Sequence, residues 1–84
     1  MTVVDARGLR CPLPVLRLAK VAASAADGEE IELWATDPAA EPDVRAWARM
    51  RGHELLGSGP LEKENDDGDL EAAVVVTVRV VRPT

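Results

Sequence analysis

The sequence predicts an α+β protein, a two-layer βαβαββ sandwich in which two helices pack on one face of a mixed four-stranded sheet. Segments with alternating or β-branched apolar residues are interleaved with two segments of helical periodicity. The last two strand candidates are separated only by a turn-forming stretch, so the chain closes on a hairpin. With 84 residues and a mass of 9.0 kDa, the chain has the size of one domain, and we treat residues 1–84 as a single domain.

The first strand and the first helix follow each other across a glycine. Thr2–Asp5 carries β-branched residues and forms a short strand, and Gly8 supplies a turn after it. A helix follows from Pro12 to about Ala26, because polar residues recur there every three or four positions. Its apolar stripe consists of Val15, Leu18, Ala19, Ala22 and Ala26. Proline is tolerated in its first turn, because the amide that proline lacks has no partner inside the helix there.

A second strand and a second helix repeat this order. Residues 30–36 alternate between apolar and polar, which predicts a half-buried strand with its odd-numbered residues facing the core and Trp34 facing away. The dipeptide Asp37-Pro38 forms a turn, and a helix from about Pro42 to Arg51 follows. The apolar stripe of this helix consists of Val44, Trp47 and Ala48.

The C-terminal third predicts a hairpin with a long acidic connection. Residues 53–58 form a weak strand, the Gly-, Asn- and Asp-rich stretch 59–69 is a loop, and Ala72–Arg82 is a long β-branched strand. The core face of that strand carries Val74, Val76, Val78 and Val80. With both helices on one side, the other face of the sheet is open, and a partner protein could dock there around Trp34. The outward residues of this face are Glu30, Glu32, Trp34, Val75, Thr77, Arg79 and Val81.

Composition excludes several classes of protein. One Cys and one His cannot form an intramolecular disulfide or a four-ligand zinc site, and we expect no metal and no cofactor. No apolar run approaches the ~18 residues of a membrane span, and the N-terminus lacks the order of a signal peptide, so a cytoplasmic protein without membrane contact is expected. A net charge of -5, with two Trp as the only aromatic residues, disfavours direct nucleic-acid binding.

Positive charge is concentrated around the single cysteine. Residues 1–20 carry four basic residues and one acidic residue, whereas the rest of the chain carries six basic and fourteen acidic residues. The four basic residues are Arg7, Arg10, Arg17 and Lys20. They can orient an acidic partner, because complementary charge raises the encounter rate, and ordinary solvation of a loop and a helix is the alternative.

Cys11 stands where the first helix is predicted to begin, and this position favours a reactive thiol. A sulfur at a helix N-terminus meets unpaired amides and the positive end of the helix dipole, and Arg7 and Arg10 add positive charge. Such settings lower the pKa of cysteine from ~8.5 into the range of about 3.5 to 7.5, so we expect a thiolate. Pro14 replaces the second cysteine of a C-x-x-C redox motif, which leaves chemistry that holds one group on one sulfur.

Two other interpretations of Cys11 stay open. Free cysteine is among the most buried residue types, so Cys11 can also be a filler of the core. A cysteine hydrolase would need a histidine as base, and His53 is the single candidate. More simply, His53 fixes the start of the third strand through a hydrogen bond, and Asp5 braces the turn before Gly8.

Motif residues are spread over nearly the whole chain. The segment from Asp5 to Pro14 reads DARGLRCPLP and contains a CPxP motif. It is followed by Lys20, Gly28, Asp37-Pro38, Asp43 and the segment Gly52-His53-Glu54-Leu55. With these residues at these distances, the sequence resembles the TusA (SirA-like) family of sulfur carriers.

The resemblance implies a βαβαββ sandwich whose cysteine accepts sulfane sulfur as a persulfide and passes it to another protein. Carried over by position, Cys11 is the persulfide-bearing nucleophile. The supporting residues of its motif are Asp5, Gly8, Arg10, Pro12 and Pro14. The implied donor is a cysteine desulfurase or a rhodanese, and the implied acceptor is a further sulfur-relay protein in tRNA 2-thiolation, molybdenum-cofactor assembly or sulfur oxidation. No metal or organic cofactor is implied.

Two classes of function therefore compete. The first is a sulfurtransferase that acts as a persulfide carrier. The second is a regulatory or protein-binding module without catalysis, which uses the open sheet face around Trp34 and has Cys11 as a redox-sensitive handle.

Overall fold

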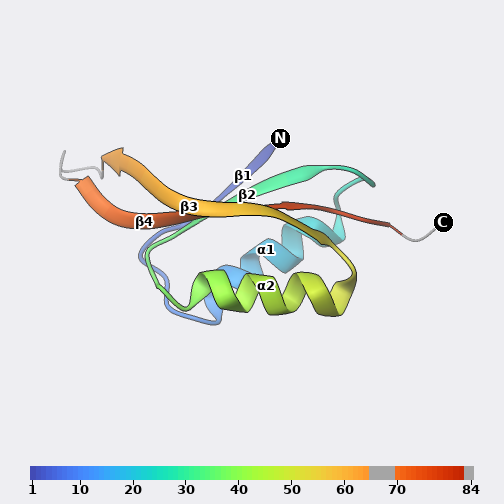
Figure 1. The fold of residues 1–84 in the computed structure, drawn as a ribbon, viewed down its shortest axis with the longest axis horizontal. Helices are drawn as coiled ribbons and strands as arrows, with labels where there is room; N and C mark the ends of the chain where they lie inside the picture. The colour runs from blue at the N-terminus through green and yellow to red at the C-terminus, as the bar shows by residue number, and fades with distance from the viewer. Residues whose placement is uncertain (65–69, 83–84) are drawn as a thin grey trace.

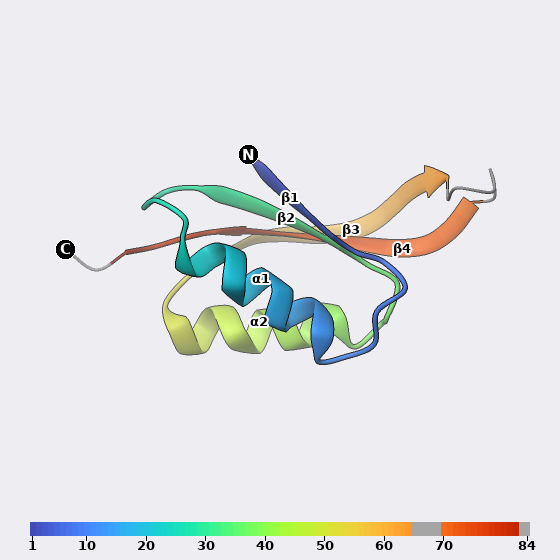
Figure 2. The ribbon, with the colours of Figure 1, turned by 180° about the vertical axis from the view of Figure 1, so that it is seen from behind.

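The computed structural model describes residues 1–64 and 70–82, and the chain follows the order βαβαββ (Figure 1). The elements are β1 (Thr2–Ala6), α1 (Leu13–Ala23), β2 (Glu30–Ala35), α2 (Ala40–Arg51), β3 (Glu54–Glu64) and β4 (Leu70–Arg79). Both helices cover one face of the sheet (Figures 1 and 2). The predicted fold class is confirmed.

The four strands form one mixed sheet in the order β1-β2-β4-β3. β1 and β2 are parallel, because α1 crosses over between them, and the other two pairings are antiparallel. Parallel strands end at the same edge of a sheet, so the loops that follow β1 and β2 meet (Figure 1, left). Both helices also begin at this edge.

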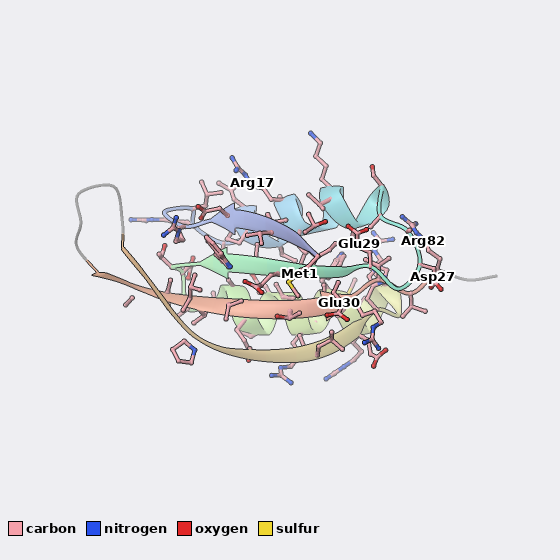
Figure 3. All side chains as sticks on the ribbon, turned by 90° about the horizontal axis from the view of Figure 1, so that it is seen from above. Met1, Arg17, Asp27, Glu29, Glu30 and Arg82 are labelled. Atoms are coloured by element: carbon pink, nitrogen blue, oxygen red, sulfur yellow. The ribbon has the colours of Figure 1, made fainter. Side chains whose placement is uncertain are left out.

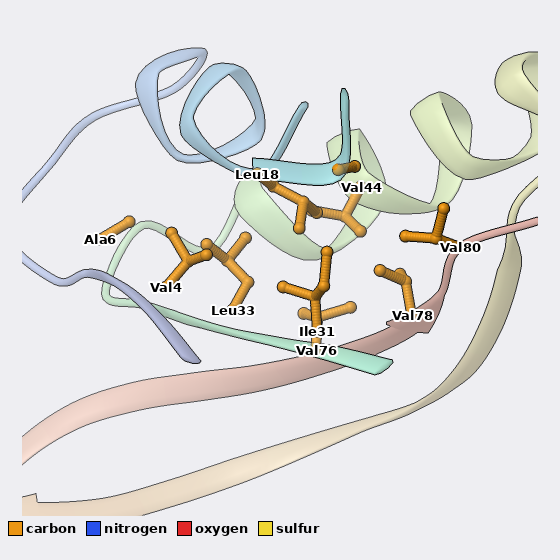
Figure 4. Close-up of a cluster of buried hydrophobic side chains, with 10 residues drawn as sticks. Val4, Ala6, Leu18, Ile31, Leu33, Val44, Val76, Val78 and Val80 are labelled. Atoms are coloured by element: carbon orange, nitrogen blue, oxygen red, sulfur yellow. The ribbon is translucent and has the colours of Figure 1, made fainter. Parts of the chain in front are cut away.

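The core lies between the sheet and the helices (Figure 4). Alternate residues of β1, β2 and β4 point toward the helices, where Leu18 of α1 and Val44 of α2 are fully buried at 0% exposure. The strand residues of this core are Val4, Ala6, Ile31, Leu33, Val76 and Val78, and Val80 joins them just after β4. Burying a side chain such as Leu18 stabilises the fold by about 1.5–3 kcal/mol.

Both helices differ from their predicted bounds. α1 begins at Leu13 and ends at Ala23, so Ala26 is exposed and lies outside the apolar stripe. The chain leaves the helix early because the Gly28 amide donates to the Val80 carbonyl at 2.8 Å, which ties it to the sheet. α2 begins at Ala40, two residues before Pro42, and Pro42 is still in the first turn, where its missing amide leaves no helical bond unmade.

The strands of the hairpin also differ from prediction. Residues 59–64 were expected in a loop, but β3 continues through them and pairs with β4, with Pro60 opposite Val74. Gly and Pro are tolerated there because β3 is an edge strand of the sheet. β4 begins at Leu70 and ends at Arg79, earlier at both ends than predicted. Positions 65–69 of the predicted loop lie outside the described residues.

No helix within residues 1–64 and 70–82 covers the second face of the sheet (Figure 3). Arg79 lies across this face between Glu30 and Glu54, with nitrogen–oxygen distances of 3.4 and 3.5 Å. Trp34 is half-buried, donates from Nε1 to Glu32 at 2.7 Å, and lies 5.3 Å below the Arg7 guanidinium. The predicted open face is therefore present.

Candidate functional site

The cysteine is carried by the loop between β1 and α1, which is fixed to the loop that follows β2. Gly8 adopts a φ of 83°, in the left-handed region that favours glycine. Its amide donates to Thr36 Oγ1 at 2.9 Å, and the Leu9 amide donates to the Ala6 carbonyl at 3.2 Å. The two loops are therefore joined directly before the chain reaches Cys11.

Cys11 lies in a turn that precedes α1 and does not begin the helix. Pro12 is the N-cap residue, and the Leu13 amide donates to the Arg10 carbonyl at 2.9 Å. The Cys11 side chain is half-buried, whereas Pro14 is fully buried in the first turn. Because Cys11 reaches the surface, its interpretation as a core filler is wrong.

Two aspartates bind Cys11 from the opposite loop and helix. The Cys11 amide donates to Asp37 Oδ2 at 2.7 Å, and the Cys11 thiol donates to Asp43 Oδ2. Asp37 Oδ1 also accepts a hydrogen bond from the Ala39 amide at 2.9 Å, which fixes the turn before α2. Asp43 belongs to the first turn of α2.

These contacts raise the pKa of the Cys11 thiol to about 11. The hydrogen bond to Asp43 is the largest cause, followed by burial and by the negative charges of Asp43 and Asp37. The expectation of a thiolate at neutral pH is therefore wrong. Its premise fails because Pro12 and Pro14 have no amide hydrogen, and the intervening Leu13 amide is bonded to Arg10.

Arg7 and Arg10, the basic residues nearest to Cys11 in sequence, act on aspartates and not on the Cys11 sulfur. Arg7 pairs with Asp5 at 2.8 Å, and hydrogen bonding by Arg7 lowers the pKa of Asp5. This pair braces the turn before Gly8, as predicted for Asp5. Arg10 is exposed and helps to lower the pKa of Asp37, after the backbone amides of Cys11 and Ala39.

The remaining predicted docking residues lie on two elements. Arg17 and Lys20 are exposed on α1, whereas Trp34 lies on β2 and faces away from the core residues Ile31 and Leu33. The structure therefore does not bring the four basic residues and Trp34 into one surface.

An apolar groove of about 390 Å³ runs between α1 and α2 from the Cys11 turn. Pro12, which follows Cys11, and Asp43, which binds its thiol, both line this groove. Leu16 and Met50 also line it and are 56% and 79% exposed. A protein that approaches the Cys11 sulfur along the helices would meet this surface.

His53 lies at the far end of α2 from Cys11. Its Nδ1 accepts the Val81 amide at 3.0 Å, which supports the predicted structural role at the start of the third strand. Cys11 contacts Asp43 in the first turn of α2, whereas His53 follows the last turn, and the helical rise from Asp43 to His53 is about 15 Å. This separation excludes His53 as the base of a cysteine hydrolase.

Within residues 1–64 and 70–82, no group of three His, Cys, Asp or Glu side chains is arranged to hold a metal ion. In the same part of the chain, none of the helices has the length and apolar character needed to cross a membrane.

Fold and site together define a small two-layer α+β protein with one accessible cysteine before its first helix. Residues 2–75 match the family model described as Sulfurtransferase TusA, and the chain belongs to this family. The resemblance predicted from the sequence is thereby confirmed. The family supports a sulfur-carrier role for the chain, and such a role implies exchange with donor and acceptor proteins.

Individual relatives agree with this assignment. The chain is 42% identical over 55 residues to sulfur carrier protein TusA of Allochromatium vinosum, covering 66% of this chain and 72% of the relative. It is 38% identical over 68 residues to YrkI of Bacillus subtilis, a candidate sulfur carrier, covering 81% and 83%. The crystal structure of a SirA-like protein from Desulfitobacterium hafniense has a TM-score of 0.69 and 26% identity, covering 98% of this chain and 100% of that one.

Sequence reasoning missed the contacts of Asp37 and Asp43 with Cys11. The sequence places Asp37 in a turn and in the family pattern, and Asp43 in the family pattern alone, without linking either residue to the cysteine. The sequence did contain a signal for these contacts. A βαβ unit predicts parallel strands, and the loops that follow parallel strands meet at one edge of the sheet.

Proposed function

We propose that this protein is a sulfurtransferase that carries sulfane sulfur as a persulfide on Cys11. The observation that carries the proposal is the half-exposed position of Cys11 at the edge where two loops and two helices meet. Gly8 and the prolines shape the turn that presents the sulfur, and the Asp5–Arg7 pair braces it. Arg10 supports the site through its charge on Asp37.

Sulfur transfer to Cys11 is an exchange between two sulfur–sulfur bonds. The Cys11 sulfur loses its proton and attacks the outer sulfur of a donor persulfide. A new bond forms between Cys11 and that outer sulfur, the bond inside the donor persulfide breaks, and the donor leaves as a thiolate that takes up a proton. Cys11 then bears the persulfide, the donor is a thiol, and no external oxidant or reductant is consumed. Delivery to an acceptor repeats the same exchange.

The donor in this proposal is a cysteine desulfurase or a rhodanese, and the acceptor is a further sulfur-relay protein. Transfer brings the two sulfur atoms to a bonding distance of about 2 Å, so either partner has to cover the surface around Cys11. The groove between α1 and α2 begins there and offers exposed apolar side chains. The pathway served is tRNA 2-thiolation, molybdenum-cofactor assembly or sulfur oxidation, in a reducing cytoplasm that keeps Cys11 free.

The experiment is persulfide formation with a protein donor. The full chain is incubated with a cysteine desulfurase, pyridoxal phosphate and cysteine, and separately with a rhodanese and thiosulfate, and its intact mass and Cys11 peptide are measured. We expect the mass of one sulfur atom to be added at Cys11. Cys11→Ser is expected to keep the fold and to gain no mass, and absence of the adduct with both donors would contradict the proposal.

A further inference from the structure

We propose that Asp43 holds Cys11 in its thiol form in the free protein, so that the sulfur becomes a nucleophile when a partner displaces the Asp43 carboxylate. This inference rests on the proposed carrier function and concerns the regulation of the same site. It makes Asp43 a residue that controls transfer through direct contact with the reacting sulfur.

The geometry places Asp43 where it can act on the sulfur alone. Its Oδ2 accepts a hydrogen bond from the Cys11 thiol, whereas Asp37 Oδ2 accepts one from the Cys11 backbone amide at 2.7 Å. Asp43 lies in the first turn of α2, where the positive end of the helix dipole favours a negatively charged side chain. A carboxylate is only an acceptor, so the hydrogen between it and the sulfur must come from the thiol.

The charged groups that act on the Cys11 sulfur both disfavour its ionisation. Asp43 reaches it from α2 and Asp37 from the loop before α2, and both charges raise the pKa of Cys11. On the cysteine's own segment, the Arg10 charge acts on Asp37. Ionisation of Cys11 would therefore place a third negative charge beside two carboxylates.

A resting thiol gives a carrier a chemical advantage between partners. The thiolate is the form that reacts with peroxides and stray disulfides, so a protonated Cys11 is protected while it is exposed. A partner that offers a hydrogen-bond donor or a positive charge to Asp43 replaces the thiol as its ligand. The sulfur is then released at the moment when the donor persulfide is in place.

Alkylation by iodoacetamide tests this inference without a sulfur donor. The rate is measured on the full chain across a pH series for the wild type and for Asp43→Asn. For Asp43→Asn we expect the midpoint of the pH–rate curve to fall toward the pKa of an unperturbed cysteine. We also expect the alkylation rate at neutral pH to rise roughly five-fold or more. The gain in thiolate outweighs the lower nucleophilicity of a more acidic sulfur.

Two further variants separate contact with the sulfur from loss of charge. Glu41→Gln removes a carboxylate from the same helical turn. Because Glu41 binds Arg45, we expect the alkylation rate of the Glu41→Gln variant to match that of the wild type. Asp43→Glu restores an acceptor and is expected to return the rate toward the wild-type value. An unchanged or slower rate in Asp43→Asn would overturn the inference.

The wild-type curve provides a test that survives a failure of the variant to fold. Its midpoint is expected well above that of a cysteine in a free peptide, and a midpoint at or below the peptide value would overturn the inference. Alkylation needs no sulfur donor. Faster alkylation of Asp43→Asn, combined with no persulfide on Cys11, would therefore refute only the carrier function. Persulfide formation on Cys11, together with equal alkylation rates for the wild type and Asp43→Asn, would refute only the control by Asp43.

Discussion

Cys11 combines access to solvent with a thiol that resists ionisation. Its neighbours in sequence are basic, but its neighbours in space are Asp37 and Asp43. Charge along the chain was therefore a poor guide to charge at the sulfur, because Arg7 is engaged by Asp5, and Asp37 and Asp43 reach Cys11 from another loop and from α2. The pKa of Cys11 follows the spatial neighbours.

The pH dependence of stability can be predicted at His53. Burial, followed by the charges of Arg82 and Arg51, lowers the pKa of His53 below 6.5. As the pH falls through 6.5, the unfolded chain binds a proton at this residue before the folded chain does, so the contribution of neutral His53 to the free energy of unfolding is lost.

Urea unfolding of the wild type and of His53→Asn checks this expectation. Asn does not titrate in this range and can offer an acceptor to the Val81 amide. The stability difference between the two proteins is expected to change in favour of the variant between about pH 7.5 and 5. A constant difference across this range would contradict the lowered pKa.

At the level of the elements, the C-terminus of α1 is held by a residue beyond β4. The Arg82 guanidinium donates to the carbonyls of Ala22, Ala23 and Ala25 at 2.8, 2.6 and 3.0 Å. These carbonyls lie at and after the end of the helix, where intrahelical partners run out. A cation at this position also complements the negative end of the helix dipole.

Arg82→Met is expected to lower the free energy of unfolding by about 1 kcal/mol, because it keeps the apolar stem but removes the donors. Chemical denaturation measures the change. Arg17→Met, in the exposed middle of α1, serves as the matched control and is expected to change stability by less than about 0.5 kcal/mol. Equal effects of the two substitutions would show that Arg82 does not cap the helix.

The elements themselves were predictable where periodicity is strong. Both helices, β2 and the core face of β4 follow from spacing alone. The predicted element bounds were wrong where pairing with a distant segment decides the conformation. Gly28 bonds to Val80, and Pro60 lies in β3 opposite Val74. Local signals at these positions favour turns, and only pairing within the sheet overrides them.

At the scale of the whole molecule, the proposed carrier function predicts docking on the helix side and not on the open sheet face, because the groove between α1 and α2 begins at the Cys11 turn. Leu16 lines the groove beside Cys11, whereas Val3 lies on β1, and they are 56% and 48% exposed. We expect Leu16→Glu to slow transfer from a protein donor roughly five-fold, corresponding to about 1 kcal/mol of lost apolar contact.

Two comparisons separate docking from reactivity. Val3→Glu introduces the same charge at similar exposure and is expected to leave transfer unchanged, and loading of either variant by inorganic polysulfide is expected to match the wild type. If Val3→Glu or Trp34→Glu slowed transfer and Leu16→Glu did not, the open sheet face would be the docking surface.

The candidate site was predictable only in part for a related reason. Cys11 and its turn residues are consecutive in sequence and could be identified together. Asp37 and Asp43 come from another loop and helix, and their contact with Cys11 depends on the parallel pairing of β1 with β2. A motif identifies the cysteine, whereas the pKa of its thiol depends on the packing of the whole chain.

The most direct test of the central claim is whether Cys11 gains one sulfur atom that a reductant can remove. Sulfur and two oxygens have nearly the same mass, so the Cys11 peptide is measured after donor treatment, before and after dithiothreitol. A persulfide is expected to revert to the unmodified mass under reduction, with release of sulfide. A mass gain that resists reduction would be a sulfinic acid, and that result, or no gain at all, would contradict the role of Cys11 as a sulfur carrier.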